Sequence, residues 1–216
     1  VTLGITPNYP ETGYGYIKMN VDSPKLNGFE VERFVEKPNI ELAKEYLASG
    51  KYLWNSGMFI WKVSSIISNI KTFIPDMYDG LKNIQAAIGT PDEDIALKQI
   101  FPELESVSID YGIMEKASDI FVLPGNFGWD DVGSWLAIER IKGADEDGNC
   151  LTGNVLSYGT KNCTIEAKDK LIAVVGMKDT IVVDTEDATL ICDKSSAGDI
   201  KKILEMIRNK NLNQYL

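Results

Sequence analysis

The spacing of the apolar residues changes near residue 143, and this change constrains the fold more than any other feature. Up to about Lys142, short apolar runs alternate with helical patterns, which is typical of α/β architecture. From about Gly143 the helical period disappears. The segment 143–149 is acidic and bounded by glycine, so it resembles a linker. We therefore expect two domains, residues 1–142 and residues 143–216.

The second domain is expected to be rich in strands. Short β-branched runs recur there between turn signals at a spacing of roughly 8–12 residues, which favours a small sheet, a sandwich or a β-helix-like coil. A terminal helix follows, because apolar residues return there at helical spacing. The expected strands are 154–157, 163–166, 171–175, 180–183 and 189–192, and the helix has Ile200, Ile203, Leu204 and Ile207 on one face.

The first domain combines strands and helices. Asn39 and Gly50 are suitable cap residues and predict a helix over 40–49. Aromatic and β-branched residues predict a strand over 52–63, interrupted at 55–57. Proline residues separate the remaining helical patterns. The other expected elements are helices over 64–73, 76–87, 93–101 and 134–141, and a short buried strand over 120–123.

Composition restricts the chemistry. The 216 residues include no histidine, which excludes Ser/His/Asp and Cys/His nucleophiles and zinc sites that use histidine. The net charge of −10 argues against binding to nucleic acid or to an anionic membrane. No apolar run approaches the roughly 20 residues that span a bilayer. Three cysteines without C-x-x-C spacing suggest reduced thiols and a cytoplasmic protein.

Two segments near the start combine residues that suit a sugar phosphate. Glu11, Gly13 and Tyr14 lie in a run that interleaves glycine and tyrosine, which allows close approach of a ligand. Taken alone, this run favours a turn with core tyrosines. Lys37 offers a charge to a phosphate and Glu36 an acceptor to a sugar hydroxyl. A surface ion pair at a strand end explains these two residues equally well.

Three later segments leave similar alternatives open. Asn55 and Ser56 are polar residues between large apolar ones, so they suit either a hydroxylated ligand or a β-bulge at Gly57. Asp110 begins a helical pattern, and capping accounts for most of that motif. Asp131 or its neighbour Asp130 is a candidate ligand for Mg²⁺, and an Asx turn is the alternative.

Together and in this order, the segments resemble one family, the bacterial mannose-1-phosphate guanylyltransferases, within the sugar-phosphate nucleotidylyltransferases. The resemblance covers almost the whole chain. It is carried by the segments 6–17, 34–38, 54–59, 108–116, 128–135 and 179–188.

The resemblance implies an α/β fold. The expected first domain is an incomplete Rossmann-like nucleotidyltransferase domain, a mixed sheet with flanking helices. A small β-rich, β-helix-like domain and a C-terminal helix follow. The family opens with a Gly-rich loop, G-G-x-G-x-R-L-x-P-L-S, which cradles the triphosphate, and with a first metal-binding Asp. Neither is found in the 216 residues. We therefore expect a fragment that lacks the nucleotide-binding half and is inactive alone.

The resemblance also implies a reaction, in which GTP and α-D-mannose 1-phosphate give GDP-mannose and diphosphate with Mg²⁺ as the cofactor. Lys37 and Asp131 are then the expected catalytic residues, Lys37 against the sugar phosphate and Asp131 as the metal ligand. Lys116 and Asp110 are weaker candidates. The expected substrate-binding residues are Glu11, Gly13, Tyr14, Glu36, Lys37, Asn55, Ser56 and Asp110.

The family resemblance further implies a homodimer. Other functions stay open from the residues alone. They are a non-catalytic module that binds a sugar phosphate or sugar nucleotide, another hexose-1-phosphate nucleotidylyltransferase, and an oligomerisation scaffold. Supplying the missing N-terminal piece in trans distinguishes an enzyme fragment from a binding module and from a scaffold.

Overall fold

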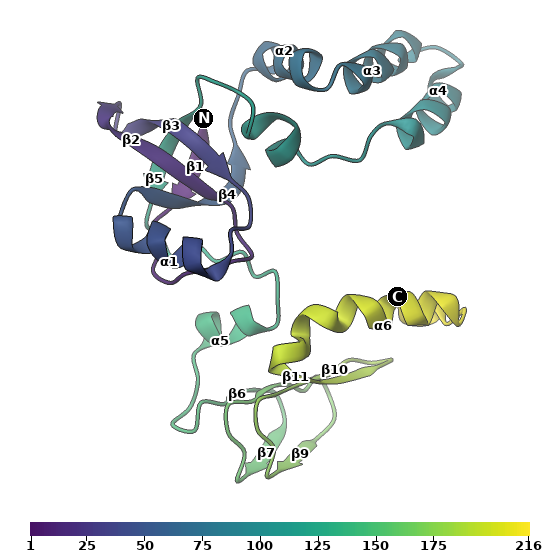
Figure 1. The fold of residues 1–216 in the computed structure, drawn as a ribbon. Helices are drawn as coiled ribbons and strands as arrows, with labels where there is room; N and C mark the ends of the chain where they lie inside the picture. Colours follow the sequence, from purple (N-terminus) through teal and green to yellow (C-terminus); the bar gives the residue numbers. More distant parts are fainter. The chain divides into compact units, whose positions relative to one another are not determined.

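The computed structural model describes residues 1–216, which form two compact units, Val1–Trp129 and Asp130–Leu216 (Figure 1). The helix α5 (Leu136–Lys142) belongs to the second unit. It is bonded there to the strands that follow, because Lys142 Nζ donates to Glu166 Oε1 at 2.7 Å and Lys194 forms an ion pair with Glu139. Along the chain, the boundary between the two compact units therefore lies before this helix. The domain limits of 1–142 and 143–216 stay a prediction.

The first unit is built on a closed barrel of five strands in the order β1-β4-β2-β3-β5. Strands β1 and β5 are parallel and the other neighbours are antiparallel, so the expected mixed sheet is confirmed. The sheet closes on itself, which the sequence pattern did not predict. The strands are β1 (Thr2–Ile5), β2 (Tyr16–Lys25), β3 (Gly28–Val35), β4 (Tyr52–Phe59) and β5 (Phe121–Gly125).

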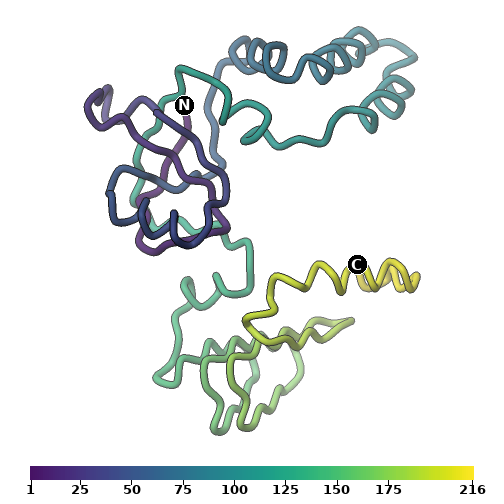
Figure 2. Tube along the Cα trace, in the orientation of Figure 1, coloured from purple at the N-terminus to yellow at the C-terminus, as the bar shows by residue number.

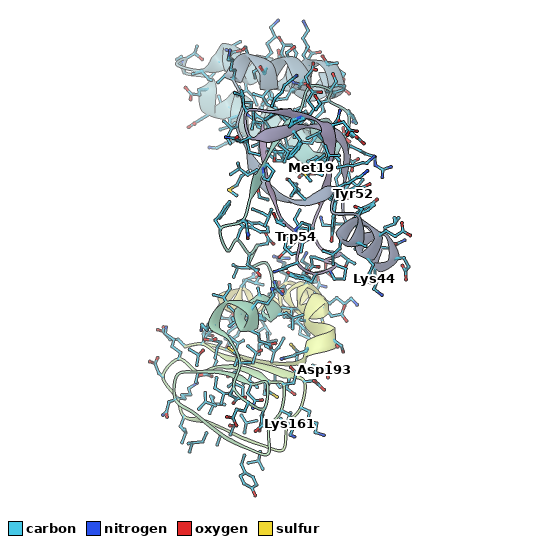
Figure 3. The ribbon with its side chains drawn as sticks, turned by 90° about the vertical axis from the view of Figure 1, so that its left-hand side faces the viewer. Met19, Lys44, Tyr52, Trp54, Lys161 and Asp193 are labelled. Atoms are coloured by element: carbon cyan, nitrogen blue, oxygen red, sulfur yellow. The ribbon has the colours of Figure 1, made fainter.

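Alternate residues of the barrel strands pack into two different clusters, as the two faces of a strand require. Leu53 belongs to one cluster, and its neighbours Tyr52 and Trp54, labelled in Figure 3, belong to the other. The second cluster includes Tyr46 of the helix α1 (Ile40–Ser49), whose ring stacks on Tyr52 with centroids 3.9 Å apart. The first cluster consists of Ile17, Met19, Phe34, Leu53, Met114, Ile120 and Val122.

Helix α1 confirms its prediction from cap residues. The side chain of Asn39 accepts a hydrogen bond from the backbone N–H of Leu42 at 2.9 Å, which satisfies a donor of the first turn. Gly50 ends the helix with φ of 65°, a left-handed conformation that glycine adopts without cost.

A helical segment follows β4 and returns to β5 (Figure 1). The predicted helices are present, with ends shifted by one or two residues. Proline residues separate them, as expected. The segment closes with a π-helical turn, η2 (Asp110–Met114), where a helix start was expected. The preceding elements are α2 (Val63–Phe73), α3 (Pro75–Ala87), α4 (Glu93–Ile100) and the short 3₁₀ turn η1 (Phe101–Glu103).

The second unit is a short β-helix, so the β-helix-like expectation is confirmed. Its parallel strands stack coil on coil (Figure 2), with Cys150, Thr164 and Ile181 in equivalent positions. Strand β11 pairs antiparallel with β10 and ends the stack. The strands are β6 (Cys150–Thr152), β7 (Val155–Tyr158), β8 (Thr164–Glu166), β9 (Ile172–Val175), β10 (Thr180–Asp184) and β11 (Thr189–Asp193).

The β-helix has its own core, formed by Cys163, Ile165, Val174 and Val182. The 3₁₀ turn η3 (Lys194–Asp199) leads into the helix α6 (Ile200–Asn209), and the short turn η4 (Asn213–Tyr215) follows. The terminal helix was predicted. No helix of the structure is long and apolar enough to span a membrane.

Two glycines of the β-helix provide a matched test of this packing. Both have positive φ, 83° at Gly153 and 61° at Gly159. A Cβ at Gly153 would lie 2.0 Å from the carbonyl oxygen of Ala167, whereas a Cβ at Gly159 would meet nothing within 4 Å. We expect Gly159→Ala to destabilise the unit by about 1–2 kcal/mol, and Gly153→Ala by about 2 kcal/mol more. Hydrogen exchange of the β10 amides measures both, and equal effects would contradict the coil packing.

Candidate active site

Glu36 and Lys37 follow the end of β3 and lie against each other. Side chains of neighbouring residues in a strand point to opposite faces. Here Lys37 has φ of 44°, which is uncommon for a residue with a Cβ, and its Nζ lies 3.2 Å from Glu36 Oε1. The Lys37 side chain is 58% exposed, whereas that of Glu36 is 10% exposed. The turn therefore presents a cation to solvent beside a buried carboxylate.

The second oxygen of Glu36 is buried and has no hydrogen-bond partner in the structure. It lies against Gly15, where a Cβ would come within 2.3 Å of Glu36 Oε2. Gly15 therefore leaves the space that the carboxylate occupies. Gly15 was not among the predicted site residues, although its place in a Gly-Tyr-Gly run was a signal. A buried oxygen without a donor is unfavourable, and a ligand hydroxyl would correct this.

Asn55 and Asp110 complete the group around Glu36. The backbone N–H of Asn55 donates to the carbonyl of Gly15 at 2.7 Å, and its Nδ2 donates to Asp110 Oδ1 at 2.9 Å. Asn55 Oδ1 accepts from the N–H of Gly57 at 3.1 Å, which fixes the amide. The structure thus brings together residues from the start of β2, the end of β3, strand β4 and the turn η2. The Asp110 side chain thus accepts a hydrogen bond from a residue 55 positions away and makes no cap hydrogen bond at η2, where the N–H of Tyr111 donates to Ser108 Oγ instead.

The charges at this site are uneven. Burial raises the pKa of Glu36, the hydrogen bond from Lys37 lowers it in part, and the charges of Asp110 and Glu115 raise it again. The hydrogen bond and charge of Glu36 raise the pKa of Lys37, so the lysine remains a cation. The site thus offers one exposed cation for a phosphate and several carboxylate oxygens for hydroxyl groups.

The loop that leads to Gly15 contains Glu11, Gly13 and Tyr14. Glu11 Oε1 accepts from the N–H groups of Thr12 and Gly13, both at 2.8 Å, so this oxygen holds its own loop. The Tyr14 ring meets Trp54 edge-on with centroids 5.4 Å apart. Tyr14 therefore packs with the aromatic cluster, as the core-tyrosine alternative predicted. A contact of these three residues with a hexose stays a prediction.

Ser56 and Lys116 differ from Asn55 in their surroundings. Ser56 Oγ donates to the carbonyl of Leu3 at 2.6 Å and accepts from the N–H of Met58 at 3.2 Å. The pairing of β1 with β4 shifts register at this point and Gly57 has φ of 69°, so Ser56 belongs to a β-bulge. The hexose contact of Ser56 and the weaker assignment of Lys116, which is exposed, stay predictions.

Asp131 lies in the second unit, so its grouping with Glu36 stays a prediction. Its neighbour Asp130 forms an ion pair with Arg140, which holds the pKa of Asp130 below its usual range. Asp131 is exposed and makes no hydrogen bond or ion pair. A Cβ at Gly133 would lie 2.4 Å from Asp131 Oδ2, so the glycine makes room for this carboxylate.

The exposed carboxylate of Asp131 fits Mg²⁺, because this ion binds one or two carboxylates together with substrate phosphates. Asp131 offers one free carboxylate. No group of three or more metal-ligating side chains is present, so the donor set does not fit an ion that needs a cage of protein ligands.

The buried oxygen of Glu36 generates a prediction about stability. Because burial raises the pKa of Glu36 in the folded state, wild-type stability falls as the pH rises from the ordinary value of 4.5 through the raised value. Glu36→Gln does not ionise. We expect the variant to match the wild type at low pH and to be more stable by about 1 kcal/mol at pH 8. Urea unfolding at both pH values measures the free energy of unfolding. The control is Glu45→Gln, the same substitution at an exposed glutamate. A less stable Glu36→Gln at pH 8 would mean that the carboxylate is already satisfied.

Comparisons with known proteins agree with the two-part fold. Residues 1–148 match the Nucleotidyl transferase family, and residues 153–207 match the MannoseP isomerase/GMP-like beta-helix domain. A crystal structure from Thermus thermophilus, described as "mannose-1-phosphate geranyltransferase", is similar with a TM-score of 0.81. It is 32% identical, and the match covers 96% of this chain and 59% of that one.

Curated relatives include the mannose-1-phosphate guanylyltransferases of Escherichia coli (strain K12) and Salmonella montevideo. The first is 39% identical over 212 residues, which cover 96% of this chain and 44% of the relative. The second is 40% identical over 222 residues, which cover 100% of this chain and 47% of the relative. The chain thus spans about half the length of these relatives. Because the family match extends over more than half of its residues, the chain belongs to the nucleotidyl transferase family.

Proposed function

We propose that this chain carries the sugar-phosphate side of a mannose-1-phosphate guanylyltransferase, which converts GTP and α-D-mannose 1-phosphate to GDP-mannose and diphosphate. The observation that carries the proposal is the buried Glu36 Oε2, which has no donor and lies beside the exposed cation of Lys37. The similarity to mannose-1-phosphate guanylyltransferases over 96% of the chain supports this substrate class.

Each residue of the group has a separate part in the proposed binding. Lys37 meets the phosphate of the sugar, because its Nζ is exposed and charged. Glu36 Oε2 accepts a hydroxyl of the hexose. Asn55 keeps one amide hydrogen for a second hydroxyl, since its other hydrogen is donated to Asp110 and its oxygen accepts from Gly57.

The proposed chemistry requires no base from the protein. A phosphate oxygen of the sugar phosphate bonds to the α-phosphorus of GTP, and the bond from that phosphorus to diphosphate breaks. The attacking oxygen is already an anion, so the lack of histidine is no obstacle. The protein must align the two substrates and offset their negative charge. Lys37 contributes to both.

A divalent metal ion is common in nucleotidyl transfer, and we propose Mg²⁺ with Asp131 as its ligand from this chain. When bound, the ion would offset phosphate charge in the transition state. The homodimer, the cytoplasmic location and the absence of nucleic-acid and membrane partners stay predictions.

The affinity of the chain for mannose 1-phosphate tests the proposed site. We expect Lys37→Met and Glu36→Gln each to weaken binding about ten-fold or more, because each removes a hydrogen bond to a charged group. Lys44→Met is the matched control, because Lys44 is an exposed lysine of α1, labelled in Figure 3, outside the group. Calorimetry measures the affinities. Equal affinities for all three variants would contradict the site.

Turnover separates the enzyme from its alternatives. No segment of the 216 residues matches the Gly-rich loop, so we expect the chain alone to make no GDP-mannose from GTP and mannose 1-phosphate with Mg²⁺. Adding in trans a segment that carries the Gly-rich loop G-G-x-G-x-R-L-x-P-L-S should then give diphosphate release that depends on Mg²⁺. Synthesis of GDP-mannose by the chain alone would refute the expectation. Binding of the sugar phosphate without restored turnover would indicate a regulatory module. If neither binding nor turnover is observed, the chain acts as an oligomerisation scaffold. Glucose 1-phosphate as a better acceptor would indicate another hexose-1-phosphate nucleotidylyltransferase.

A further inference from the structure

Asp130 is fully engaged within the second unit. Its Oδ2 accepts from Arg140 Nε at 2.7 Å and its Oδ1 accepts from Arg140 Nη2 at 3.0 Å. A bidentate pair of this kind fixes the orientation of both groups, unlike an ion pair with a single contact. Arg140 lies on α5, so the pair ties the turn before the helix to the helix itself.

The same carboxylate holds a strained backbone. Val132 has φ of 51°, a conformation that is a true outlier for a β-branched residue. Its N–H donates to Asp130 Oδ1 at 3.0 Å. Strain of this kind persists only where the surroundings over-determine it. Here the restraint is the Asp130 side chain, which Arg140 holds in place.

Packing does not hold this turn. Residues 131–134 are all exposed, and three of them, Val132, Gly133 and Ser134, line a cavity of about 780 Å³ within the second unit. A turn beside open space can move unless a specific bond prevents it. The carbonyl of Ser134 accepts from the N–H of Ala137 at 3.0 Å, which anchors the end of the turn, whereas the start of the turn is restrained by the bonds of Asp130 to Val132 and Arg140.

The residue presented by the turn is Asp131. Both oxygens of Asp130 accept hydrogen bonds, whereas the Asp131 carboxylate is free and lies over Gly133. We infer that Asp130 and Arg140 are positioning residues, which hold the strained turn so that Asp131 can serve as the metal ligand. This inference rests on the proposed role of Asp131. It gives Asp130 a task of its own beside the adjacent carboxylate of Asp131.

The test uses the ¹⁵N-labelled chain and Mn²⁺ as a paramagnetic probe, with GDP-mannose present to supply the phosphates that bind the ion together with Asp131. In the wild type we expect Mn²⁺ to broaden the amide signals of Val132 and Gly133 at lower concentration than the other amides of the second unit, and Asp131→Asn to abolish this selectivity. Arg140→Gln should raise the Mn²⁺ concentration required about ten-fold or more. It should also speed hydrogen exchange of the Val132 amide by a similar factor, because the anchor of a charged hydrogen bond is lost.

Two further variants separate positioning from charge and folding. Arg140→Lys keeps the charge but not the bidentate geometry, so it should restore part of the Mn²⁺ response. Lys202→Gln removes a cation from an exposed ion pair with Asp199 in the same unit and should leave both measurements unchanged. Unchanged hydrogen exchange in β10 reports that each variant remains folded.

The outcomes are distinguishable. If the wild type responds at Val132 and Gly133, Asp131→Asn does not, and Arg140→Gln equals the wild type, the positioning role is wrong and the metal role of Asp131 stands. If the wild type gives no selective response, the metal role fails and the positioning role fails with it. An equal loss in Lys202→Gln would make the effect one of net charge and would also overturn the inference.

Discussion

The carboxylate of Glu36 is the group around which the first unit arranges its candidate site. One oxygen meets Lys37, while the other is buried against Gly15 without a donor. Burying such an oxygen is unfavourable for the protein alone. It is tolerated here because the end of β3, the start of β2 and the amide of Asn55 are held by the closed barrel and by Asp110. A structure that retains an unfavourable group in a rigid frame is suited to a ligand that satisfies it.

Much of this architecture could be predicted because the signals are local. Asn39 and Gly50 mark the ends of α1, since capping depends on residues within one turn of the helix. The repeated β-branched runs mark the β-helix, since each coil pairs with the next at nearly constant spacing. The ordered motifs that carry the family resemblance also predicted the family that the comparisons confirm.

The rest depends on contacts between distant residues, which local patterns do not reveal. Closure of the barrel requires β1 to pair with both β4 and β5. Asp110 was expected mainly as a cap, yet it bonds Asn55. Ser56 was expected either to meet a hydroxylated ligand or to lie at a β-bulge, and only the structure shows that its hydroxyl donates to the distant carbonyl of Leu3. The left-handed φ of Lys37 and of Val132 is equally hidden, because neither residue type favours it.

The central claim is that Glu36 and Lys37 bind a phosphorylated hexose, and a crystal structure of the chain with mannose 1-phosphate tests it most directly. The account predicts a sugar hydroxyl at roughly 2.6–3.2 Å from Glu36 Oε2, with the phosphate at Lys37 Nζ. A contradictory result would be a hexose bound elsewhere while Glu36 Oε2 keeps no partner. The cavity of about 550 Å³ lined by Trp61, Ile66 and Ile113 is one such location.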